Sequence, residues 1–164
     1  MTAPRILVAG IGNVLRGDDG FGIEVVRRLR QRADLPPGVR VVDAGIGGIP
    51  LVQDLLDGYD LIVLVDAVHC GKPPGSVVVL RPELPDLNGL PADEVGALVG
   101  DPHTTTPSRV LLLARALGAL PRETLIVGCE PQTLEEMTMT LSAPVAAAVD
   151  RAVERIVILL RERP

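Results

Sequence analysis

Apolar runs separated by turn-forming residues divide the chain into predicted strands. The runs at 6–9 and 61–65 are apolar at every position, which is typical of central strands that helices cover on both faces. The strands predicted from such runs are 6–9, 39–42, 61–65, 76–80 and 125–127. Only residues 66–75 separate the third strand from the fourth, too few for a helical crossover, so we expect the fourth strand to run antiparallel to the third.

Helical periodicity follows most of these strands. After residue 19, apolar and charged side chains alternate at helical spacing up to about residue 33. The further helices predicted are 50–56, 93–99, 109–117 and 143–160. We expect Ser142 to cap the last of these. Charged residues interrupt that segment every few positions, so it is predicted to be amphipathic and not to span a membrane. The alternation of strands and helices predicts an α/β fold in a single domain, residues 1–164.

Composition narrows the class of partner. Aromatic residues make up 1% of the chain, which excludes recognition by base stacking, and the net charge of −5 without a basic run argues against nucleic acid. Two isolated cysteines, Cys70 and Cys129, cannot form a disulfide framework and fit a reducing compartment. The amino terminus enters a strand without the features of a signal peptide, so a cytoplasmic location is expected.

A glycine-rich turn carries two acids directly after the first strand. Gly10 and Gly12 suggest a dinucleotide site, but the third glycine of that fingerprint is replaced by Leu15. Asp18 and Asp19 then stand where a phosphate would bind, and two carboxylates there repel an anion and attract a cation. The alternative is purely structural: Asp18 caps the following helix and Asp19 favours its positive end.

Three acids follow three of the predicted strands: Asp19, Asp43 and Asp66. Acids are common in turns for reasons of backbone geometry, but Asp66 ends a wholly apolar strand, where a carboxylate needs a partner. His103 lies in a polar loop before a helix and complements two carboxylates as a mixed oxygen and nitrogen site for a divalent metal, although an exposed histidine explains it too. His69 is a weaker competitor as ligand.

Several motifs together resemble one known family. They are the turn from Gly10 to Gly22, the strand 61–65 closing in Asp66, the His103 loop before a helix, and Gly128-x-x-Pro131 followed by Leu141-Ser142. In these motifs the chain is similar to the hydrogenase maturation proteases, the endopeptidases of [NiFe]-hydrogenase assembly. The resemblance implies a three-layer sandwich of phosphorylase/hydrolase-like type, with a five-stranded, mostly parallel twisted sheet of order 2-1-3-5-4 and an antiparallel strand 4.

The resemblance also implies a reaction and its residues. Such enzymes remove a C-terminal peptide from the nickel-loaded large-subunit precursor, and Asp19, Asp66 and His103 would occupy the positions that are catalytic and that engage nickel. The nickel is supplied by the substrate, and other divalent cations can occupy such a site in vitro. The precursor is the implied partner, with neither nucleic acid nor membrane involved.

A second loop offers candidates for holding the substrate tail. Asp43 is followed by Gly45, Gly47 and Gly48, a strand end with an acid and glycines like the first one. Three acids further along, Glu130, Glu135 and Glu136, could line the far side of a cleft, although a solvated loop explains them equally well.

Other functions remain open at this level. The same residues fit a noncatalytic nickel-sensing chaperone, and a nucleotide-dependent oxidoreductase is a further alternative. Serine hydrolysis of the Gly-x-Ser-x-Gly type and zinc proteolysis of the His-Glu-x-x-His type have no support, because neither motif is present. Cys70 beside His69 could serve as a nucleophile, but we expect it to be a small buried residue.

Overall fold

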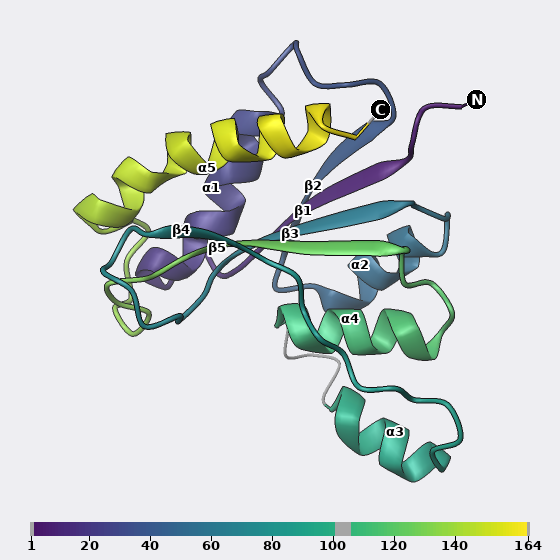
Figure 1. The fold of residues 1–164 in the computed structure, drawn as a ribbon. Helices are drawn as coiled ribbons and strands as arrows, with labels where there is room; N and C mark the ends of the chain where they lie inside the picture. The colour runs from purple at the N-terminus through teal and green to yellow at the C-terminus, as the bar shows by residue number, and fades with distance from the viewer. Residues whose placement is uncertain (1, 101–105, 164) are drawn as a thin grey trace.

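One mixed sheet runs through the molecule. The computed structural model describes residues 2–100 and 106–163. Its strands are β1 (Ile6–Ile11), β2 (Val39–Gly45), β3 (Leu61–Ala67), β4 (Val77–Leu80) and β5 (Glu123–Cys129). Their order is β2-β1-β3-β5-β4, with β4 antiparallel to β5 and the other neighbours parallel (Figure 1). The predicted order and the predicted direction of the fourth strand are confirmed.

Helices cover both faces of this sheet and make the predicted three layers. The first face carries α1 (Phe21–Leu29) and α5 (Ala143–Arg161), and the second carries α2 (Gly48–Leu55) and α4 (Pro107–Ala116) (Figure 1). A further helix, α3 (Ala92–Val99), packs against α4 away from the sheet. Alternate residues of each central strand enter the two cores, and so β1 and β3 are apolar at 6–9 and 61–65, before Asp66.

Four strands extend beyond their predicted bounds: β1 continues to Ile11 and β3 to Ala67. β2 extends through Asp43 to Gly45, and β5 begins at Glu123 and ends at Cys129. The polar residue at the start of β5 does not break the strand because Glu123 forms ion pairs with Arg81 and Arg163. Strand pairing depends on the backbone, so the apolar run marks the centre of a strand better than its ends.

The glycine turn holds α1 close to the sheet. A Cβ on Gly22 would lie 2.1 Å from the carbonyl oxygen of Val65 and 2.6 Å from that of Ile11. A Cβ on Gly10 would lie 2.4 Å from the carbonyl oxygen of Gly22. Gly12 has a φ of 139°, which favours glycine, and a Cβ there would lie 1.8 Å from a backbone oxygen of Asp19. The helix can therefore cross β1 and β3 only because these residues lack side chains.

Within residues 2–100 and 106–163, no helix is both long and apolar enough to cross a membrane.

Candidate active site

Asp19 and Asp66 lie at the carboxyl edge of the sheet, close enough for the charge of one to act on the other. Asp19 lies in the short 3-10 helix η1 (Gly17–Gly20), which follows β1, and its Oδ2 accepts the N–H of Asn13 at 2.9 Å. Asp66 is the penultimate residue of β3 and is 7% exposed. Burial, and secondarily the negative charge of Asp19, raises the pKa of Asp66 to about 8. The charge of Asp19 is thus felt by Asp66, 47 positions further along the chain.

The Asp66 carboxyl has little to stabilise its charge. Its Oδ1 accepts the N–H of Ala67 at 2.8 Å, and within the described ranges it forms no ion pair. A buried carboxyl beside a second one is stabilised when a cation binds both, so the pair is suited to attract a metal ion carried by a ligand.

The third predicted ligand cannot be placed beside this pair. His103 lies outside the described residues, so its role stays a prediction. In the part of the chain that is described, no group of three or more histidine, cysteine, aspartate or glutamate residues could hold a metal ion. The two acids therefore form an incomplete site by themselves.

Asp18 does not cap the helix that follows it. It is fully buried, its Oδ1 accepts the N–H of Ser142, and its Oδ2 accepts the N–H groups of Gln132 and Thr133. Ser142 occupies the N-cap position of α5, as predicted, but its hydroxyl donates to Asp18 and makes no capping hydrogen bond to the helix. Asp18 instead ties the loop 131–142 to the turn that carries Asp19.

Asp18→Asn is expected to lower the free energy of unfolding by about 2–4 kcal/mol at pH 7, because an amide NH₂ would face donors that now find an acceptor. Burial opposes ionisation of Asp18, but the N–H groups of Ser142, Thr133 and Gln132 outweigh it and lower its pKa. The stabilisation from Asp18 is therefore present above about pH 4 and is lost as the pH falls further. The free energies of unfolding of the wild type and of Asp18→Asn, measured by denaturant melts, should converge between pH 7 and pH 3. A difference that stays constant over this range would contradict the role assigned to Asp18.

The second glycine loop lies next to the first. The N–H of Gly12 donates to the carbonyl of Gly45 at 2.9 Å. The side chain of Asp43 is exposed, and its Oδ1 accepts the N–H of Gly45, so it shapes its own turn. Gly47 precedes α2 and Gly48 is its first residue. The role of these residues in holding a substrate stays a prediction.

Sequence reasoning gave too little weight to Glu130. It is 7% exposed and follows β5 directly, whereas Glu135 and Glu136 are exposed. Its carboxylate accepts the N–H of Cys70 at 2.6 Å and lies 3.2 Å from Nδ1 of His69. The signal that singled out Asp66, an acid at the end of an apolar strand, also applies to Glu130.

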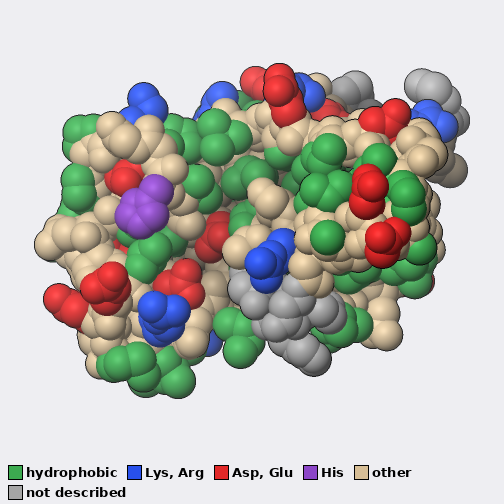
Figure 2. Space-filling view, turned by 90° about the horizontal axis from the view of Figure 1, so that it is seen from below, with side chains coloured by type: hydrophobic (Ala, Val, Ile, Leu, Met, Phe, Trp, Pro, Cys, Tyr) green, Lys and Arg blue, Asp and Glu red, His purple; other side chains and the backbone are tan. Residues whose placement is uncertain are grey.

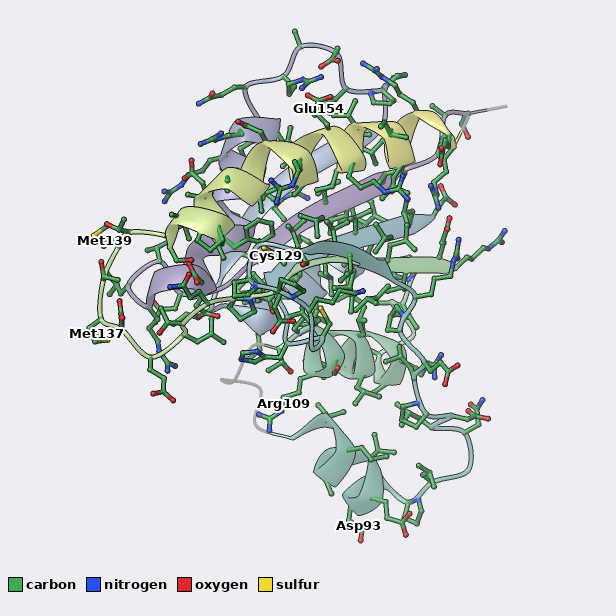
Figure 3. All side chains as sticks on the ribbon, turned by 60° about the vertical axis from the view of Figure 1, so that its left-hand side comes forward. Asp93, Arg109, Cys129, Met137, Met139 and Glu154 are labelled. Atoms are coloured by element: carbon green, nitrogen blue, oxygen red, sulfur yellow. The ribbon has the colours of Figure 1, made fainter. Side chains whose placement is uncertain are left out.

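The cysteines do not look like nucleophiles. Cys70 is only partly buried, so the prediction that it is a buried residue is wrong. The hydrogen bond of its thiol to Glu130, and secondarily its partial burial, raise the pKa of Cys70 and keep the thiol protonated. Cys129 is fully buried between β5 and α5, and burial raises its pKa to about 11 (Figure 3).

The fold and the two acids at its sheet edge define the class: an α/β protein with a three-layer sandwich and a candidate site where strands β1 and β3 end. Residues 23–158 match the family model described as hydrogenase maturation protease. The hydrogenase expression/formation protein HoxM of Azotobacter vinelandii is 40% identical over 164 residues, which cover 99% of this chain and 75% of the relative. The hydrogenase 2 maturation protease of Escherichia coli K12 is 34% identical over 159 residues, which cover 96% of this chain and 92% of the relative.

Solved structures agree. The hydrogenase maturating endopeptidase HybD from Escherichia coli superposes with a TM-score of 0.74 at 33% identity, covering 96% of this chain and 93% of that chain. The chain therefore belongs to the hydrogenase maturation protease family and is a peptidase, as the resemblance implied.

Proposed function

We propose that this protein is the endopeptidase that removes the C-terminal extension of a nickel-loaded [NiFe]-hydrogenase large-subunit precursor. The observation that carries the proposal is that a buried Asp66, which forms no ion pair with the described residues, feels the charge of Asp19 at the carboxyl edge of the sheet. Membership of the family supports the hydrogenase precursor as substrate. Two free cysteines support processing in the cytoplasm.

The two carboxylates explain how cleavage depends on metal insertion. The nickel belongs to the substrate, and Asp19 and Asp66, with His103 as the third proposed ligand, bind it and so fix the adjacent peptide bond at the sheet edge. A precursor without nickel lacks the cation that the two carboxyls would attract and gains no such interaction. The loop from Asp43 to Gly48 lies beside the Gly12 turn and would hold the extended tail.

Incubation with a precursor tests this function directly. The protein is mixed with nickel-loaded large-subunit precursor or with the nickel-free form, and the products are weighed by mass spectrometry. We expect a single C-terminal cut only in the nickel-loaded form. Asp93→Asn, which changes an exposed acid on α3 away from the sheet, is a control that should cut normally (Figure 3). An intact precursor in all reactions would contradict the proposal and leave a nickel-sensing chaperone as the alternative.

A further inference from the structure

A buried carboxylate holds an exposed imidazole beside the candidate active site. Glu130 accepts through Oε2 the backbone N–H groups of Cys70 at 2.6 Å and Lys72 at 3.4 Å. Its other oxygen lies 3.2 Å from Nδ1 of His69. The side chain of His69 is 71% exposed, whereas that of Glu130 is 9% exposed. The carboxylate is thus fixed by the loop backbone and in turn orients the imidazole.

The charge of Glu130 decides which nitrogen of the His69 ring carries the hydrogen. The N–H of Cys70, with the other donors, lowers the pKa of Glu130 to about 2, so the side chain is a carboxylate. An ionised acceptor favours a hydrogen on Nδ1, as a carboxylate does when it orients a functional histidine elsewhere. Nε2 is then directed away from Glu130 and is left for a ligand.

Register places this pair next to Asp66. Asp66 on β3 is paired with Gly128 on β5, and Glu130 follows two residues later on the same face. Strand spacing and rise put the Cα atoms of Asp66 and Glu130 about 8 Å apart. The intervening Gly128 makes room for the loop after β3, since a Cβ there would lie 3.1 Å from Val68. Figure 2 shows histidine on a face that also carries acidic side chains.

We propose that His69 is a catalytic proton donor in the proposed peptide hydrolysis, and that Glu130 is the residue that positions it; this inference rests on the proposed function. The oxygen of water bonds to the scissile carbonyl carbon, and the C–N bond breaks with its electron pair on nitrogen. Because the hydrogen of the neutral ring is on Nδ1, Nε2 of His69 first takes a proton from the attacking water and then gives that proton to the leaving nitrogen, so the ring ends as it began. Lys72, on the same loop, uses only its backbone for Glu130 and takes no part.

Variants of the full chain separate the roles of these residues. With nickel-loaded precursor, His69→Ala is expected to slow cleavage about 100-fold or more, and free imidazole in the buffer should restore part of the rate. Lys72→Ala should cut at the wild-type rate. Because the side chain of His69 is largely exposed, thermal melts of these variants should match the wild type.

Glu130 is tested through a double-mutant cycle. Glu130→Gln keeps an acceptor for the loop backbone but presents an NH₂ group to Nδ1, so we expect a lower kcat at unchanged KM. In the His69→Ala background the same change should have no further effect on rate, since Glu130 acts through the ring. Additive losses, or lack of rescue by imidazole, would assign both residues to loop structure and overturn the inference.

The proposed function and this inference fail in different ways. If the wild type cuts the precursor and His69→Ala cuts equally fast, only the role of His69 is overturned. If the wild type leaves the nickel-loaded precursor intact, the proposed function is overturned, and the inference with it.

Discussion

Asp66→Asn is expected to abolish processing and yet make the protein more stable. Asparagine still accepts the N–H of Ala67, but it removes the charge that would bind nickel, so cleavage should fall by about 100-fold or more. Burial and Asp19 raise the pKa of Asp66 to about 8 from an ordinary value of 3.8. Ionisation of Asp66 therefore opposes folding progressively as the pH rises from about 4 to about 8, and the variant escapes this cost.

Thermal melts with a chelator present measure the stability half of this prediction. The variant should melt several degrees above the wild type at pH 8, since about 1 kcal/mol shifts Tm by ~2–4 °C in a domain of this size. The difference should shrink near pH 4, where Asp66 is protonated in both states. A variant that melts lower than the wild type at pH 8 would show that the carboxylate is stabilised by a partner.

Gly22→Ala is expected to destabilise the protein by about 3 kcal/mol or more, which corresponds to a loss of at least ~6 °C in Tm. The new methyl would lie 2.1 Å and 2.6 Å from two carbonyl oxygens, and these belong to the paired strands β3 and β1 and cannot turn aside. Relief requires α1 to move off the sheet, which opens the core around Phe21 and displaces η1 with Asp19.

Gly96→Ala is the matched control for this substitution. Gly96 also lies in a helix, α3, but a Cβ there meets nothing within 4 Å. Alanine restricts the unfolded chain and favours the helix, so this variant should be as stable as the wild type or slightly more stable. If both substitutions lowered Tm equally, the close approach of α1 to the strands would not be the cause.

The sheet could be predicted from the sequence because its signals are local. Residues 6–9 of β1 and 61–65 of β3 are continuous apolar runs, and the amphipathic segment of α1 has helical spacing. The position of Asp66 followed in the same way, since an acid at the end of a buried strand must lie at the sheet edge. Strand ends were predicted less well, because at Asp43 and Glu123 backbone pairing continues past the apolar residues.

The candidate site could be predicted only in part, because several of its contacts join residues far apart in the chain. Asp18 looked like a helix cap, but its partners Gln132 and Ser142 lie 114 and 124 residues away. The contact between His69 and Glu130 spans 61 residues. No local pattern indicates which distant backbone N–H group an acid will accept.

The amino-acid sequence by itself determined the strands, the helices, the glycine turn with its acids after β1, and the acid near the end of β3, because each depends on the order of side chains along a short segment. Only the tertiary structure decided that Asp18 is structural, that Asp19 raises the pKa of Asp66, and that Gly22 rather than Leu15 provides the close helix crossing. These side chains become buried, and come near one another, only when β1, β3 and β5 align, and folding alone brings those strands side by side.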